Sequence, residues 1–384
     1  MTASDLFPRF SEKEFERRYA HLRGMMKQQN VDFVLVYGNP AGTANINYLT
    51  QYLPRSPAWL IIPNEGESSL YVHFFNHLDN IRACSIINDV KWLGGKPVST
   101  LVQHVEQMNP RPHRMGVIGL ASSIPYGQFK EILDRTNLEV VDLSRDFLNH
   151  RIVKSNEEIE WHRKGAELTD LTFTALEKGL RPGLNEYEAT TLIQQAYLPK
   201  GGFPGIHFVS ATSMHEPDRQ VPWQFPSARI LKKGFVLNTE ITATYWGYGS
   251  QAHRPFAVGE EPTALYKKLY EAAFEAYSKI AKTLRPGNTT KDIVEASDVI
   301  EEAGFTTCDS VVHGVAVTPP EMGTRNSVYP LPEMTLKENM VITIQPNPTT
   351  KDQKAGVQVG STLIVRPNGG EDIHDYPFKF VVCK

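Results

Sequence analysis

The chain has 384 residues, of which 41% are hydrophobic and 22% are charged, and its formal net charge is −3 at pH 7. This length is sufficient for two domains with a large core, and the composition is typical of a globular enzyme. A nearly balanced charge with no long basic run argues against binding to nucleic acid or to an anionic membrane. We therefore expect neither as a partner.

The cysteines and the apolar runs bear on the compartment. Three cysteines, Cys84, Cys308 and Cys383, lie far apart, which argues against a disulfide framework or a structural zinc site. No apolar run approaches the ~20 residues that span a bilayer. Residues 1–18 are polar and charged, unlike the apolar core of a signal peptide. We expect a cytoplasmic protein.

Strand and helix patterns alternate in the first part of the chain. Residues 11–30 carry apolar side chains at helical spacing, and Ser11 is a candidate N-cap. Short apolar runs predict further strands and intervening helices: strands at 31–38, 59–63, 69–74, 115–120 and 138–143, and helices near 76–84, 98–108 and 126–135. This alternation predicts an N-terminal α/β domain over residues 1–150.

A second domain is expected over residues 151–384. Its first helix is predicted after Ser155, because acidic side chains follow in the first turn. The tetrapeptide LRPG occurs at 180–183 and again at 284–287, each time between two predicted helices. Such a repeat predicts two related α/β halves around one cavity.

Four segments of the second domain form a specific combination of motifs. They read FVLNTEITATYWGYGSQAHRPFAVG (235–259), VHGVAVTPPEMG (312–323), MVITIQP (340–346) and VQVGSTLIV (357–365). Together they resemble the pita-bread family of creatinase, prolidase, aminopeptidase P and methionine aminopeptidase. Residues 39–63, with NINYLT, resemble the N-terminal domain of the same family. The resemblance implies an α/β fold with a creatinase-like N-terminal domain and a pseudo-twofold pita-bread C-terminal domain.

The resemblance also implies a metal site whose ligands are mostly replaced. In the metal-binding members, two Asp, one His and two Glu side chains hold two divalent cations. The matching positions in this chain are Glu240, Gln251, His313, Gln345 and Gly360. Amide oxygens are neutral, weaker ligands and glycine offers no side chain, so too little negative charge remains for two dications. We therefore expect no metal and no other cofactor.

Two histidines and two glutamates are candidates for acid–base catalysis. Gln251 and His253 are two residues apart on a predicted strand, so both side chains face the same side. The resemblance places His313 at the ligand histidine and Glu321 at an acidic position of the metallopeptidases. A carboxylate such as Glu240, beside imidazoles in a dry cavity, stabilises an imidazolium and predicts an acid–base pair.

Further candidates concern substrate binding. The resemblance places His207 on a strand that borders the cavity. Trp223 stands where metal-free creatinase has its catalytic histidine, and it is a candidate aromatic wall or a packing residue. Arg55 and Arg325 lie near positions where creatinase binds substrate, and guanidinium groups bind carboxylates with two hydrogen bonds. The resemblance at Arg55 further implies a homodimer in which this side chain reaches the partner's cavity.

These assignments predict a metal-independent enzyme that acts on a small, anionic, carboxylate-bearing molecule. The first choice is hydrolysis of a C–N bond, with His253 or His313 as general base and Glu240 orienting or charging the imidazole. Gln251 and Gln345 are candidate donors to the developing oxyanion. Three alternatives stay open: a metal-independent lyase, a non-catalytic binding protein, and a single zinc ion held by Glu240, His253 and His313.

Overall fold

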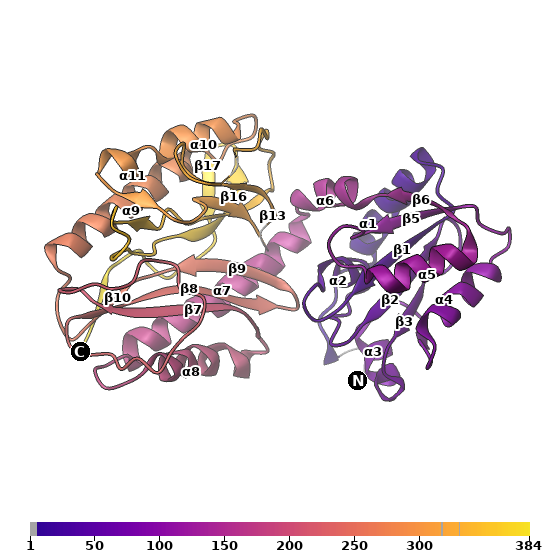
Figure 1. Ribbon diagram of the computed structural model, residues 1–384, viewed down its shortest axis with the longest axis horizontal. Helices are drawn as coiled ribbons and strands as arrows, with labels where there is room; N and C mark the ends of the chain where they lie inside the picture. The colour runs from indigo at the N-terminus through magenta and orange to yellow at the C-terminus, as the bar shows by residue number, and fades with distance from the viewer. Residues whose placement is uncertain (1–5, 316–317, 330) are drawn as a thin grey trace. The chain divides into compact units, whose positions relative to one another are not determined.

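The computed structural model describes residues 6–315, 318–329 and 331–384. The chain divides into two compact units, Met1–Arg151 and Ile152–Lys384. The first unit contains a mixed six-stranded sheet in the order β4-β3-β2-β1-β5-β6 (Figure 1). Its strands are β1 Phe33–Gly38, β2 Ala58–Pro63, β3 Ser69–Val72, β4 Asp89–Trp92, β5 Arg114–Ile118 and β6 Glu139–Asp142. All five strands predicted for this part of the chain are present, and β4 is an addition.

Helices complete the α/β arrangement of the first unit. Helix α1 (Glu12–Gln28) begins at the predicted cap, where the Ser11 side chain accepts a hydrogen bond from the Glu14 backbone N–H. Buried residues of α4 (Pro97–Glu106) and α5 (Tyr126–Thr136) pack on alternate residues of β1, which gives the sheet one covered face. The remaining helices are α2 Ala44–Thr50, α3 Leu78–Cys84 and α6 Ser144–Ile152, with a short 3-10 turn at Phe75–His77.

Two five-stranded sheets form the second unit. The first has the order β18-β10-β8-β7, with β9 paired to β8, and the second has the order β13-β12-β14-β16-β17. Their strands are β7 Phe203–Ser213, β8 Phe235–Tyr245, β9 Tyr248–His253, β10 Phe256–Val258, β12 Val312–Gly314, β13 Thr318–Met322, β14 Val341–Ile344, β16 Ser361–Arg366, β17 Gly369–Asp372 and β18 Val381–Cys383. A small pair, β11 (Thr306–Thr307) and β15 (Pro348–Thr349), lies outside both sheets. An isolated antiparallel bridge between His253 and Gly360 joins the two large sheets.

Each sheet of the second unit packs against its own set of helices. Helices α7 (Asn156–Gly179) and α8 (Glu186–Tyr197) lie against the first sheet, and α9 (Ala264–Thr283), α10 (Thr290–Ser297) and α11 (Val299–Glu302) belong to the second (Figure 1). No helix in the described parts of the chain is both long and apolar enough to cross a membrane. The three cysteines are free.

The two LRPG segments have equivalent structures, as expected for an internal repeat. Gly183 and Gly287 both have positive φ, +96° and +91°, which glycine adopts without steric cost. Each donates its N–H to the carbonyl of a distant leucine, Leu231 at 2.9 Å and Leu336 at 3.0 Å. A capping box follows each turn, formed by Asn185 with Glu188 and by Thr289 with Asp292. The C-terminal unit therefore has the pseudo-twofold organisation that the sequence repeat predicts.

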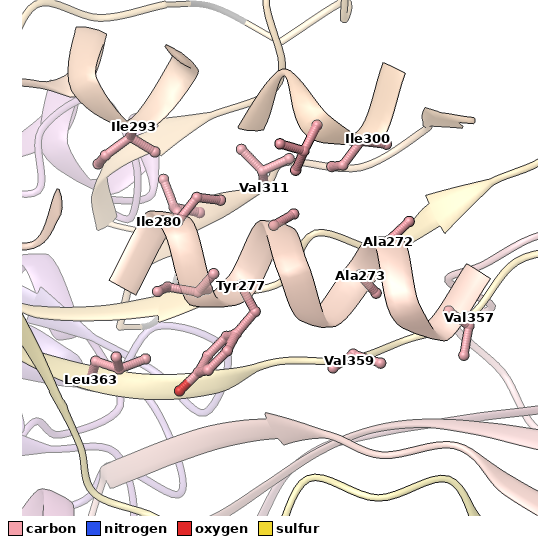
Figure 2. Close-up of a cluster of buried hydrophobic side chains, with 14 of the residues drawn as sticks. Ala272, Ala273, Tyr277, Ile280, Ile293, Ile300, Val311, Val357, Val359 and Leu363 are labelled. Atoms are coloured by element: carbon pink, nitrogen blue, oxygen red, sulfur yellow. The ribbon is translucent and has the colours of Figure 1, made fainter. Parts of the chain in front are cut away.

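The largest hydrophobic cluster packs helix α9 against the second sheet. Helix α9 contributes small side chains, Ala272 and Ala273, beside Tyr277 and Ile280 (Figure 2). They pack together with Val357, Val359 and Leu363 of the segment that leads into and through β16. Burying each of these larger aliphatic side chains contributes about 1.5–3 kcal/mol to folding. The backbone around Gly360 is therefore held by the packing of Val359 before it and Leu363 after it.

Candidate active site

Strands β8 and β9 bring three of the predicted polar side chains to one face. Glu240 and His253 are direct partners in the antiparallel register, and Gln251 precedes His253 by two residues on the same strand. The exposed fractions are 5% for Glu240, 5% for Gln251 and 0% for His253. Oε2 of Glu240 lies 3.7 Å from Nε2 of His253. A buried carboxylate therefore faces a buried imidazole.

The amide nitrogen of Gln251 lies at the centre of the cluster. It is 2.9 Å from Oε1 of Glu240, 3.0 Å from Oε1 of Gln345 and 3.1 Å from Nε2 of His253. An amide nitrogen carries two N–H groups, which the oxygens of Glu240 and Gln345 accept, whereas the role of Nε2 of His253 depends on the tautomer of its ring. The Gln251 amide therefore links the carboxylate of Glu240 to the side chain of Gln345.

The second sheet contributes the other predicted histidine. Nε2 of His313, on β12, is 3.1 Å from Oε1 of Gln345, and its Nδ1 is 2.8 Å from the carbonyl oxygen of Gly314. Both neighbours are acceptors, so the ring makes both bonds at once only when both nitrogens carry a proton. Glu321 on β13 is the direct cross-strand partner of His313, and its side chain is half-buried.

Both glutamines use their N–H groups inside this network. The Nε2 of Gln345 donates to Oδ2 of Asp309 at 3.0 Å and to the carbonyl of Ser310 at 3.2 Å. Gln251 donates toward Glu240 and Gln345, as described above. These contacts differ from the expectation that both amides point at a developing oxyanion, because the amide protons already have acceptors.

Asp309 is a member of the cluster that the sequence analysis missed. Besides the bond from Gln345, it accepts from Nδ2 of Asn347 at 2.9 Å and from the backbone N–H of Ser310 at 2.8 Å. Burial raises the pKa of Asp309 to about 7, and the negative charge of Glu240 adds to this rise. The carboxyl therefore titrates near neutral pH. The only feature of the sequence that could have pointed to Asp309 is its place in a turn-rich segment, four residues before His313.

The charge states of Glu240 and His253 follow from their surroundings. Burial lowers the pKa of His253, and the neighbouring Glu240 offsets this only in part, so the imidazole is neutral at pH 7. Burial alone would raise the pKa of Glu240. The hydrogen bond of His253, the neighbouring His313 and a 2.9 Å bond from Nε2 of Gln358 bring the pKa of Glu240 below its usual value. The pair is thus a carboxylate beside a neutral base.

Gly360 leaves room for the ring of His253. A Cβ on residue 360 would lie 2.7 Å from Nδ1 of His253 and still closer to the Ile344 carbonyl oxygen. Main-chain hydrogen bonds of 3.0 and 3.3 Å hold the two residues together. The fully buried Arg254 adds bonds from Nη1 to the carbonyls of both residues, at 2.9 Å and 2.6 Å. The Ile344 carbonyl oxygen and the His253 ring together leave no space for a side chain at position 360.

The structure does not bring His207 to the cluster. His207 is paired with Ile241 on β8, whereas Phe208 is the residue opposite Glu240. Neighbouring residues of a strand face opposite sides, so the His207 ring points away from the site and packs at 5.5 Å from the ring of Tyr197. Burial there lowers its pKa to about 4. The side chain belongs to the helix-covered face of the sheet.

The other predicted substrate-binding residues have exposed side chains. Trp223 is 42% exposed, and the guanidinium of Arg219 lies 4.4 Å from its ring. Arg325 is exposed and forms an ion pair of 2.9 Å with Asp298. Arg55 belongs to the N-terminal unit, where its side chain is exposed.

A pair of divalent cations does not fit the side chains that are present. Among the described residues, no group of three or more His, Cys, Asp and Glu side chains is arranged to hold a metal ion. Glu240, His253 and His313 are likewise not assembled as three ligands of one zinc ion. An N–H-bearing amide, that of Gln251, lies between Glu240, His253 and Gln345, and its positive end faces their acceptors. We therefore derive no step through a metal.

Comparison with known proteins decides the family. Residues 160–367 match the model of metallopeptidase family M24, and residues 18–153 match the creatinase/prolidase N-terminal domain. The chain belongs to metallopeptidase family M24. The predicted fold class, with its creatinase-like N-terminal domain and pita-bread C-terminal domain, is thereby confirmed.

Several relatives are similar over most of their length. The chain is 26% identical to a Xaa-Pro dipeptidase of Pyrococcus horikoshii over 354 residues, covering 90% of this chain and 93% of the relative. It is 22% identical to a creatinase of a Bacillus species, covering 97% and 93%. The crystal structure of an X-Pro aminopeptidase from Thermotoga maritima shares the fold with a TM-score of 0.82 at 19% identity, covering 94% of this chain and 99% of that one. These relatives support a hydrolase of the M24 family.

Proposed function

We propose that this chain is a metal-independent hydrolase that cleaves a C–N bond in a small carboxylate-bearing molecule. The observation that carries the proposal is the position of the Gln251 amide, whose nitrogen lies within 3.1 Å of Glu240, His253 and Gln345. Hydrogen bonds hold these side chains together, whereas metal ions hold the corresponding side chains in the metal-binding members of the family. The histidines then exchange protons with water and substrate as general acid and base.

In this proposal, His253 is the general base. Its imidazole is neutral and lies 3.7 Å from the Glu240 carboxylate, which stabilises the imidazolium that forms. His253 takes a proton from water while the water oxygen bonds to the carbon of the scissile C–N bond. The electron pair on the oxygen of the tetrahedral intermediate then re-forms the double bond to carbon, and the C–N bond breaks.

His313 is the proposed proton donor to the leaving nitrogen. Its two ring nitrogens face the oxygens of Gln345 and Gly314 at 3.1 Å and 2.8 Å. Transfer of one proton to the departing nitrogen avoids expulsion of an anion. The proton that His253 took from water restores His313 through solvent at the end of the cycle.

We further propose a homodimer in which the partner's Arg55 binds the substrate carboxylate. The proposal rests on the resemblance of residues 39–63 to the family's N-terminal domain and on the exposure of the Arg55 side chain. A guanidinium binds a carboxylate with two parallel hydrogen bonds. Arg325 is left out of this role because its charge is already paired with Asp298.

The test is isotope incorporation. The full-length protein is incubated in water enriched in oxygen-18 with a mixture of small amino, amidino and ureido carboxylic acids, and products are identified by mass spectrometry. A hydrolase places one labelled oxygen on the product carbon, and His253→Ala should abolish the label. An unlabelled elimination product would show a lyase instead. No product from any compound would favour a non-catalytic binding protein.

A further inference from the structure

Arg254 is a cation in the interior of the C-terminal unit, beside the proposed general base. It directly follows His253, its exposed fraction is 0%, and it is one of the largest fully buried side chains among the described residues. Within those residues it forms no ion pair, and the charges of Asp170 and Asp372 act on it without a hydrogen bond. Burying a charge without a paired anion is costly, so other groups must stabilise this guanidinium.

Main-chain carbonyl groups and aromatic rings take the place of that anion. Nε of Arg254 donates to the carbonyl of Pro377 at 3.1 Å, and Nη2 donates to that of Tyr376 at 2.8 Å. The centre of the guanidinium lies 3.9 Å from the ring centroid of Phe378 and 5.6 Å from that of Phe173, distances at which a cation is attracted to a ring face. The side chain thus ties the last part of the chain to the end of strand β9.

The third nitrogen, Nη1, spans the bridge between the two large sheets. It donates to the carbonyl of His253 at 2.9 Å and to the carbonyl of Gly360 at 2.6 Å. The same two carbonyls accept the main-chain hydrogen bonds of the bridge, from the Gly360 N–H at 3.3 Å and from the His253 N–H at 3.0 Å. Each oxygen therefore uses both of its lone pairs, and one side chain reinforces a bridge that has only two main-chain hydrogen bonds.

The imidazole of His253 is not oriented by a hydrogen bond to its second nitrogen. Nε2 lies toward Glu240 and Gln251, whereas Nδ1 is buried and has no hydrogen-bond partner among the described residues. A catalytic base is usually oriented by a third group that bonds to it. Here the direction of the ring depends on the main chain of His253 and on the groups packed around it.

We propose that Arg254 is a positioning residue for His253. By bonding to both carbonyls of the bridge, it fixes the main chain that aims the imidazole at Glu240, and it makes Tyr376 and Pro377 part of the support of the site. This inference rests on the proposed function, since it concerns the general base of the same site. The competing explanation is that Arg254 only anchors the end of the chain, in which case any other loss of anchoring should have the same effect.

Three variants separate the two explanations. Arg254→Lys keeps the charge but has three N–H donors, too few for four carbonyls. Phe378→Leu leaves Arg254 in place and removes the aromatic ring that covers it, so it decides the question alone if Arg254→Lys does not fold. Glu177→Ala is the control. It removes the bonds from the Tyr376 hydroxyl at 2.8 Å and from Nζ of Lys379 at 2.7 Å, which anchor the C-terminal segment to α7, and leaves the bonds of Arg254 in place.

The measurement that needs no turnover is NMR of protein labelled with nitrogen-15 in its histidine rings, with the His253 signals assigned from His253→Ala. Arg254→Lys and Phe378→Leu should shift the ring signals of His253, whereas Glu177→Ala should lower the melting temperature and leave those signals in place. In the oxygen-18 assay, Arg254→Lys should lower kcat about 10–100-fold and change KM less than about threefold, because misplacement by ~1 Å costs on the order of 10²-fold in the chemical step.

The ring signals are read without turnover, so the two proposals fail separately. Unmoved His253 signals in the folded variants of Arg254 and Phe378, or equal shifts in Glu177→Ala, would overturn the positioning role. If the signals move as expected but no labelled product forms, Arg254 positions the histidine and the hydrolase proposal fails. If labelled product forms and kcat of Arg254→Lys stays within about twofold of the unmodified chain, the hydrolase stands and the positioning role is wrong.

Discussion

The ring of His253 occupies the space that a side chain on residue 360 would need. A Cβ at Gly360 would lie 2.7 Å from Nδ1 of His253, well inside van der Waals contact. The same two residues form the bridge between the two large sheets of the C-terminal unit. A Cβ there would lie closer still to the main-chain oxygen of Ile344, so both the His253 ring and the neighbouring strand require glycine at this position.

Gly360→Ala tests this coupling. The added methyl group should displace the His253 ring, lower the free energy of unfolding by about 1–3 kcal/mol through overpacking, and reduce kcat. Gly24→Ala is the matched control, because Gly24 lies on the exposed side of α1 and a Cβ added there would meet no other atom within 4 Å. That change should leave kcat intact and stabilise the helix by up to about 1 kcal/mol. Unchanged kcat in Gly360→Ala would show that the position of the His253 ring is not needed.

The two histidines should behave as a unit in mutant kinetics. His253→Ala and His313→Ala should each lower kcat by ~10²–10⁴-fold, as is typical for general acid–base groups. The double variant should be little worse than the poorer single one, because groups that act together are non-additive. Glu240→Gln should also lower activity, since it removes the charge that stabilises the imidazolium. His215, which is exposed and bonded to Glu260, provides the control: His215→Ala should be fully active. Full activity in either site variant would remove that residue from the mechanism.

Asp309 should make stability depend on pH. Its pKa is 3.8 in an ordinary setting and about 7 in the folded chain, so the folded state holds the proton more tightly. The stabilisation that this gives is fully present below pH 3.8 and is lost as pH rises toward 7. Asp309→Asn cannot ionise. Its stability relative to the unmodified chain should therefore increase by roughly 2 kcal/mol between pH 5 and pH 8. Urea unfolding at both pH values measures this change, and a pH-independent difference would contradict the assigned pKa.

Arg55 tests the composite site. Arg55→Ala should raise KM for a carboxylate substrate strongly, by an amount equivalent to about 2–5 kcal/mol if the charge pair is buried when substrate binds. Arg325→Ala is the matched control and should have little effect, because an exposed ion pair such as that with Asp298 contributes about 0–1 kcal/mol. Sedimentation of the purified protein gives its oligomeric state. A monomer, or an unchanged KM in Arg55→Ala, would contradict the dimer proposal.

The fold and the centre of the cluster could be predicted from the sequence, because both depend on patterns between residues that are close together in the chain. The two-residue spacing of Gln251 and His253 predicts a shared strand face, and the β8–β9 register places His253 opposite Glu240. The two LRPG turns predicted the internal repeat. Strand β4 was not predicted, because its four residues, DVKW, are too few and too polar to stand out.

Register and long-range contacts account for what the sequence did not predict. The pairing of β7 with β8 shifts between Pro204 and His207, and a shift of one residue exchanges the two faces of a strand. His207 therefore lies on the side opposite to the one expected. Asp309 meets its partners Gln345 and Asn347 only after folding, since they are 36 and 38 residues away in the sequence. No local pattern marks such a contact.

We propose that hydrogen bonds, and not metal ions, organise this site. The most direct measurement is the metal content of purified protein, by elemental analysis, in the same sample whose activity is assayed with and without a chelator. We predict less than about 0.1 transition-metal ion per chain and unchanged activity in chelator, because amide and glycine positions offer too little negative charge for dications. One or two ions per chain, lost together with activity and restored with it, would contradict the account.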